Sequence, residues 1–150
     1  MALFFGKTDG KLDEKGRVMI PSQYRKQLAD ENILQVICRF DAHLCSLSIY
    51  TPSVWEEKFR LAKEKIDENT KDGKQLLWQL FSSTEYLDID AAGRILLNKS
   101  QREEINIEKE VLFAGMGDYF TITKKENHKE KMLSETEFED LLSEKLKRTN

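Results

Sequence analysis

One stretch of the chain occurs twice, and this internal repeat limits the possible folds more than any other feature of the sequence. The segment LDEKGRVMI begins at Leu12, and a similar segment, IDAAGRILL, begins 77 residues later at Ile89. The same offset pairs Arg25 with Arg102. Two repeats are too few for an open array of repeats. The sequence therefore predicts a duplicated module of about 50 residues.

Each copy contains the pattern Asp-x-x-Gly-Arg, which predicts a tight turn between two strands. The aspartate can accept hydrogen bonds from the backbone N–H groups that follow it, and the glycine supplies the positive φ that closes the turn. By this argument Asp13 and Gly16 shape the first turn, and Asp90 and Gly93 shape the second. A short apolar run follows each arginine, as expected for a buried strand. One such turn is common, but two in matching settings are specific.

The remaining segments predict an α+β chain that is mainly β. In each copy a short helix follows the apolar run, and a pair of strands joined by a polar turn then predicts a hairpin. Four segments are expected: a first module, a helical connector, a second module, and a charged tail that is predicted to be helical. Their bounds are 1–52, 53–83, 84–131 and 132–150. Apolar residues at helical spacing in a charged background support the two helical segments.

The net charge of −3 and the pI of about 5.5 argue at first sight against nucleic-acid binding, since such domains often have a pI above ~9. The distribution of charge argues the other way. Residues 5–26 carry six basic side chains against three acidic ones, a local excess of three positive charges: Lys7, Lys11, Lys15, Arg17, Arg25 and Lys26 against Asp9, Asp13 and Glu14. An acidic body with a basic edge can bind DNA, especially if oligomerisation repeats that edge.

Several functional classes are not supported by the sequence. No apolar run approaches the ~20 residues of a membrane helix, and the N-terminus lacks the basic start of a signal peptide, so we expect a cytoplasmic protein without membrane contact. There is no glycine-rich phosphate loop or nucleophile elbow, and the two histidines, His43 and His128, do not have ligand spacing. We expect no enzyme, no cofactor, no metal and no small-molecule substrate.

Local chemistry leaves two interpretations open for the repeated arginines. A planar guanidinium on a rigid turn suits phosphates and bidentate contact with guanine. It suits equally well an ion pair with an acidic side chain across the fold.

The motifs as a set resemble the MraZ family, which belongs to the SpoVT/AbrB-type swapped-hairpin barrels. The resemblance rests on FFG from Phe4, LDEKGRVMIP from Leu12, YTPSVWE from Tyr50 and DAAGRI from Asp90, and it covers residues 3–131. It implies that two modules interleave into one pseudo-two-fold β-barrel with peripheral helices. It also implies a nucleoid-associated transcriptional regulator of the division and cell wall gene cluster, which forms rings and binds short G-rich direct repeats in double-stranded promoter DNA.

In this family the DNA contacts come from the repeated turn, chiefly from its arginine. Carried over, these are Arg17 with Lys15 beside it, and Arg94 in the second copy. The second copy departs from the pattern, because Ala92 stands where the first has Lys15 and Asn98 stands where a proline is expected. Three further basic residues are expected to contact phosphates, which position a protein without specifying sequence: Lys7, Lys11 and Arg25.

A second hypothesis from another class is an oligomeric protein-assembly module without DNA binding. The acidic pI motivates it. It predicts that charge reversal in the acidic tail abolishes function and that a change at Arg17 does not.

Overall fold

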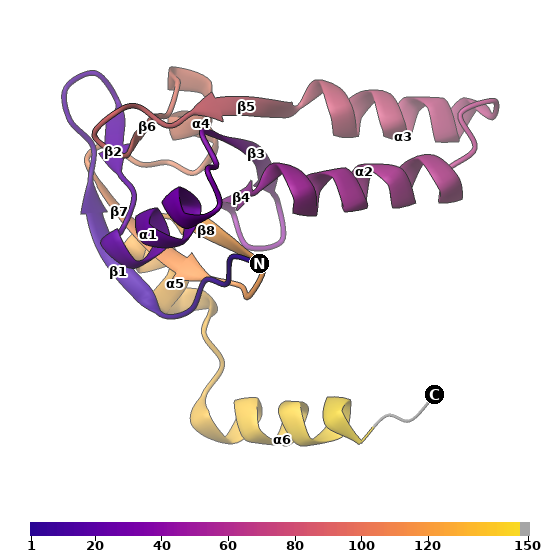
Figure 1. The fold of residues 1–150 in the computed structure, drawn as a ribbon. Coiled ribbons are helices and arrows are strands. Elements are labelled where there is room, and N and C mark those ends of the chain that lie inside the picture. The colour runs from indigo at the N-terminus through magenta and orange to yellow at the C-terminus, as the bar shows by residue number, and fades with distance from the viewer. Residues whose placement is uncertain (148–150) are drawn as a thin grey trace.

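The computed structural model describes residues 1–147, and in it the same elements occur twice along an α+β chain (Figure 1). The first repeat consists of β1 (Lys7–Lys11), β2 (Arg17–Met19), α1 (Ser22–Asp30), β3 (Gln35–Asp41) and β4 (Ser46–Tyr50). The second consists of β5 (Thr84–Asp88), β6 (Arg94–Leu96), α4 (Lys99–Glu104), β7 (Glu110–Gly115) and β8 (Tyr119–Thr123). The predicted duplication is confirmed, element by element.

The strands of the two repeats interleave. Antiparallel pairs join β1 to β7, β2 to β6, β3 to β5 and β4 to β8, and each of these pairs takes one strand from each repeat. The hairpins β3–β4 and β7–β8 pair strands within a repeat. The result is a six-stranded sheet in the order β1-β7-β8-β4-β3-β5 and a two-stranded sheet, β2–β6. Neither repeat can complete these sheets alone.

The core takes alternate residues from these strands, and this alternation decides what faces outward. Val18 of β2 lies directly opposite Ile95 of β6, and both are buried in the core. Phe4, Phe113 and Phe120 fill the centre of the same core with edge-to-face and tilted ring contacts. Because Val18 and Ile95 point inward, their neighbours along the two strands point outward.

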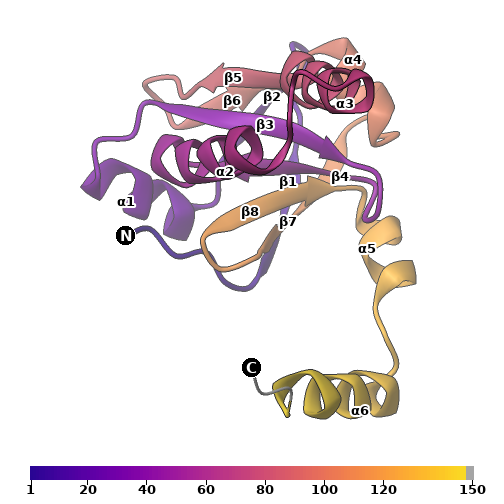
Figure 2. The same ribbon diagram turned by 90° about the vertical axis from the view of Figure 1, so that its right-hand side faces the viewer.

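Within residues 1–147, four further helices do not belong to the repeated set of elements. Helices α2 (Pro52–Lys65) and α3 (Lys71–Ser82) form an arm that projects from the body between the two repeats (Figure 1). Helices α5 (Lys125–Lys131) and α6 (Glu135–Leu146) follow β8, and α6 stands apart from the body (Figure 2). No helix within residues 1–147 has the length and apolar character needed to cross a membrane. The predicted segment bounds stay a prediction, and residues 148–150 of the predicted tail lie outside the described residues.

Candidate nucleic-acid interface

The first repeated turn is built around one carboxylate. Asp13 Oδ1 accepts hydrogen bonds from the backbone N–H groups of Lys15 and Arg17, each at 2.9 Å. The backbone N–H of Gly16 donates to the carbonyl oxygen of Asp13 at 3.0 Å, with Gly16 at φ +89°. The left-handed conformation at this position requires glycine, because other residues adopt it only with strain.

The second turn repeats the geometry of the first. Asp90 Oδ1 accepts from the backbone N–H groups of Ala92 at 3.0 Å and Arg94 at 2.8 Å. Gly93 has φ +88°, and its N–H donates to the carbonyl oxygen of Asp90 at 2.9 Å. The aspartates and glycines thus have the positions in the structure that the pattern predicts for shaping the turns.

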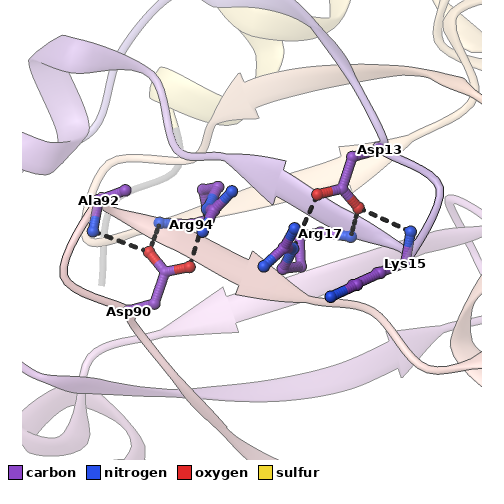
Figure 3. Close-up of polar contacts among 6 residues, drawn as sticks. All are labelled: Asp13, Lys15, Arg17, Asp90, Ala92 and Arg94. Carbon is purple, nitrogen blue, oxygen red and sulfur yellow. Dashed lines mark hydrogen bonds and ion pairs between the residues drawn. The ribbon is translucent and has the colours of Figure 1, made fainter.

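The same two carboxylates also hold the arginines, as Figure 3 shows. The Nε of Arg17 donates to Asp13 Oδ2 at 2.7 Å, and the Nε of Arg94 donates to Asp90 Oδ2 at 2.8 Å. Each ion pair therefore lies within its own turn and does not cross the fold. Among residues 1–147, no hydrogen bond or ion pair occupies an Nη atom of either arginine. Each guanidinium is oriented through Nε, and its outer edge is free to bind another group.

The turn lowers the pKa of both aspartates. The backbone N–H of Arg17 has the largest effect on the pKa of Asp13, the guanidinium of Arg17 lowers that pKa further, and partial desolvation opposes both. The backbone N–H and guanidinium of Arg94 act on the pKa of Asp90 in the same way, again against partial desolvation. Both carboxylates are therefore ionised at neutral pH and keep the arginines in place.

The two arginines share the outer face of the β2–β6 ribbon. In the antiparallel register, Arg17 lies opposite Leu96 and Met19 lies opposite Arg94, so the arginines occupy diagonal corners of one face. Their side chains are about one-third exposed, while Met19 and Leu96 are exposed. A two-stranded ribbon of this kind fits the major groove of B-DNA.

Each turn is clamped by the other repeat. The backbone N–H of Ile20 donates to the carbonyl oxygen of Gly93 at 3.0 Å, and that of Leu97 donates to Gly16 at 2.9 Å. Arg25 donates from Nε to the carbonyl oxygen of Ile20 at 2.7 Å, and its side chain lies over Gly93.

The clamp has a second arginine, Arg102, that was not among the site residues predicted from the sequence. The side chain of Arg102 lies over Gly16, in the place that Arg25 takes over Gly93. The 77-residue offset that pairs Arg25 with Arg102 was the available signal.

The structure brings some of the other predicted basic residues to this face and not others. Lys15 lies exposed in the first turn, and Lys11 ends β1 immediately before that turn. Lys7 lies at the opposite end of β1, near α5, where burial and the charge of Lys7 lower the pKa of His128. Arg25 is half-buried in the clamp. Lys15 therefore shares the turn with Arg17, Lys11 lies beside the ribbon at the level of Met19, and Lys7 lies away from it.

The hollow beside the ribbon has an acidic lining that both arginines share. It is shallow, with a volume of about 750 Å³, and its acidic side chains belong to or precede the second turn: Glu85, Asp88 and Asp90. The side-chain amides of Asn98 and Gln101 donate to Glu85 at 3.1 and 2.7 Å. Asn98, which replaces the expected proline, also caps α4 in a reciprocal capping box with Gln101.

Comparison with known proteins agrees with the duplicated architecture. The family model of the MraZ protein matches residues 3–76 and again residues 80–149. A protein called transcriptional regulator MraZ from Bacteroides thetaiotaomicron is 31% identical over 144 residues, which cover 96% of this chain and 92% of the relative. Proteins of the same name from Hydrogenovibrio crunogenus and Haemophilus influenzae are 30% and 34% identical, over 84% and 80% of this chain and 82% and 79% of those relatives.

Proposed function

This chain belongs to the MraZ family, and from that premise we propose that it is a DNA-binding transcriptional regulator and not an enzyme. The β2–β6 ribbon enters the major groove of promoter DNA and presents Arg17 and Arg94 to base edges. The DNA carries short direct repeats in the promoter of the division and cell wall gene cluster, and the protein binds them as a ring. It works at the nucleoid, in the cytoplasm.

The observation that carries this proposal is the state of the two arginines. Each is fixed through Nε by an aspartate of its own turn, which leaves the Nη edge of the guanidinium open. Bidentate contact from arginine to the O6 and N7 atoms of guanine is the commonest specific contact in the major groove. A side chain already held in place loses little conformational entropy when it binds. Guanine-rich repeats, which the family resemblance implies, would offer this contact.

The arrangement of the strands supports the finer description of the fold as a swapped-hairpin barrel. An antiparallel bridge between Leu12 and Val18 links β1 to β2. On the other side of the ribbon, β5 lies beside β6. Because β1 and β5 are the two edge strands of the six-stranded sheet, the ribbon connects both of its edges. The ribbon then closes the sheet and stands at the rim of the barrel.

Oligomerisation compensates for the small number of DNA contacts that one ribbon can make. A three-residue strand pair can contact few base pairs, and the protein as a whole has a net charge of −3. Several ribbons spaced to match direct repeats add their contacts through a high effective concentration. Lys11, Lys15 and Arg25 contact phosphates beside each ribbon, and Lys7 contacts DNA where the duplex follows β1.

The test is fluorescence anisotropy on duplexes from the upstream region of the protein's own gene, at two salt concentrations. We expect wild-type affinity to fall as salt rises, because lysines and arginines displace counterions from the phosphates. Arg17→Ala should weaken binding about ten-fold or more. The matched control is Arg60→Ala on α2, which removes a charge already paired with Glu57 and Glu64 far along the arm from the ribbon.

The outcomes separate the two hypotheses. Loss of binding in folded, oligomeric Arg17→Ala with normal binding in Arg60→Ala supports the ribbon. If both variants bind DNA equally well, the DNA contact is not made by Arg17 of the first turn. Failure of the wild type to bind duplex at low salt favours the assembly module, which the exposed apolar face of α6 also favours.

A further inference from the structure

Helix α6 has an apolar face that no part of the described chain, residues 1–147, covers. Phe138, Leu141, Leu142 and Leu146 recur at the spacing of one helical face and are between 40% and 75% exposed. A helix of twelve residues is marginal in water without packing against another surface. Its start is nevertheless well defined, by a reciprocal capping box between Ser134 and Glu137. The helix is therefore suited to stabilisation by a surface outside its own chain.

The α2–α3 arm has an apolar groove along the seam between its helices. Two hollows of about 580 and 430 Å³ share Phe81, whose ring lies 5.3 Å from that of Phe59 across the seam. The α2 residues that line the hollows fall on one helical face. The apolar lining is largely aromatic, and it includes a tryptophan that is 75% exposed: Trp55, Phe59, Leu77, Trp78, Phe81 and Tyr86.

The helix and the groove match in length and in charge. At 1.5 Å per residue, α6 is about 18 Å long and α2 is about 21 Å long. The first two turns of α6 are acidic, and Lys145 lies near its end. The groove has Lys63 and Lys74 toward the tip of the arm and Glu56 toward the body. Lys63 already holds Glu68 at 2.6 Å, which reduces the negative charge at the tip.

These charges favour one direction for a docked helix. In that direction the acidic start of α6 would meet Lys74 at the tip of the arm, and Lys145 would meet Glu56. On a helical wheel, Glu135 lies one turn before Phe138 and Glu139 one turn before Leu142, beside the apolar face.

The two surfaces belong to separate parts of one molecule. Figures 1 and 2 both show α6 standing apart from the α2–α3 arm. A connection of three residues, 132–134, ties α6 to α5. Two different, complementary surfaces that do not meet within one chain can join successive copies head to tail, and such contacts generate rings when the rotation closes.

We propose that α6 of one copy docks in the groove between α2 and α3 of the next copy. Phe138, Leu141 and Leu142 pack on Trp78 and Phe81 and form a three-helix contact with the arm. The inference rests on the oligomer of the proposed function and names its interface. Aromatic side chains such as Trp78 commonly dominate the energy of such contacts.

The experiment measures the mass of the full-length protein by light scattering after gel filtration. We expect Phe138→Ser/Leu142→Ser and Trp78→Ser each to lower the mass to that of a monomer, with the circular dichroism spectrum of the sheets unchanged. The matched control is Leu34→Ser, because Leu34 is 74% exposed, about as much as Trp78, and lies outside both surfaces. It should keep the wild-type mass.

Mixing the two defective variants tests the head-to-tail geometry. One variant keeps an intact groove and the other an intact α6, so the mixture should form dimers and nothing larger. A contact between identical surfaces would give no such rescue. Lys74→Glu should lower the mass, and Glu135→Lys in the same chain should restore it at least in part.

Several results would overturn the inference. If Phe138→Ser/Leu142→Ser keeps the wild-type mass, the interface does not involve α6. This conclusion holds even if Trp78→Ser is monomeric. Anisotropy on the same samples separates this failure from that of the proposed function. If the wild type is itself monomeric but binds duplex DNA, the docking of α6 is refuted and DNA binding by the ribbon is not.

Discussion

The turn at Asp13 and the turn at Asp90 have the same skeleton in different electrostatic surroundings. In both, one carboxylate accepts two backbone N–H groups and the Nε of the following arginine, and a glycine at φ near +90° closes the turn. Five local positions decide this geometry, so two copies of Asp-x-x-Gly-Arg reproduce it.

The positions around that skeleton differ in charge. Where the first turn has Glu14 and Lys15, the second has Ala91 and Ala92. The acidic side chains of the adjoining hollow do not distinguish the turns, because both arginines line that hollow. The turns therefore differ chiefly in Lys15, which can contact a phosphate beside Arg17 and has no counterpart beside Arg94. The two arginines should accordingly contribute unequally to DNA binding.

The largest effect should come from the glycines. A Cβ at Gly16 would lie 2.8 Å from the carbonyl oxygen of Leu97, whereas a Cβ at Gly93 would meet the side chain of Arg25. A backbone atom cannot move as easily as a long side chain. We expect Gly16→Ala to lower the free energy of unfolding by about 2–4 kcal/mol and Gly93→Ala by about 1–2 kcal/mol.

Urea unfolding of the two glycine variants, measured under conditions that keep the same oligomer, checks the difference. Equal losses would mean that the contact with Leu97 relaxes without cost and that the two turns are mechanically equivalent.

A smaller effect should follow from exchanging the lysine between the turns. Lys15→Ala should weaken DNA binding about two- to five-fold for all sequences and reduce the slope of affinity against salt by about one. Ala92→Lys should strengthen binding and increase the slope by a similar amount. Salt titration of the anisotropy signal measures both. If Ala92→Lys has no effect, the second turn does not approach a phosphate.

The smallest expected effect is a loss of folding stability at acidic pH, to which both turns should contribute. The folded state holds the pKa of Asp13 and of Asp90 below the ordinary value of 3.8. The stabilisation is therefore complete above that ordinary pKa and is lost as the pH falls through the lowered pKa. Carbon-13 NMR of the carboxyl groups should give both midpoints below 3.8.

The variant Arg17→Ala should raise the Asp13 midpoint and leave that of Asp90 unchanged, since each arginine acts on its own turn. Movement of both midpoints would show that the two ion pairs are coupled across the ribbon.

The sequence predicts the parts of this fold that depend on local patterns. The duplication and the turns are visible because Asp13, Gly16 and their counterparts act on neighbours within five residues. The hairpins follow from polar turns between apolar runs.

Contacts that depend on long-range packing could not be predicted from local patterns. The placement of Arg25 over Gly93 and of Arg102 over Gly16 requires the two repeats to interleave. The basic residues that are close in sequence do not all lie together in the fold, because β1 places Lys7 at the end far from the turn. Local chemistry allowed either an ion pair or DNA contact for the arginines, but Nε can pair with the aspartate while the Nη edge remains open.

The most direct test of the central claim compares the dissociation constants of Arg17→Ala and Arg94→Ala on one promoter duplex at one salt concentration. The unequal surroundings of the two turns predict that Arg17→Ala binds several-fold more weakly than Arg94→Ala, and that both bind more weakly than the wild type. A larger loss in Arg94→Ala, or no loss in either variant, would contradict a DNA-reading ribbon in which Lys15 strengthens the contact of the turn at Asp13.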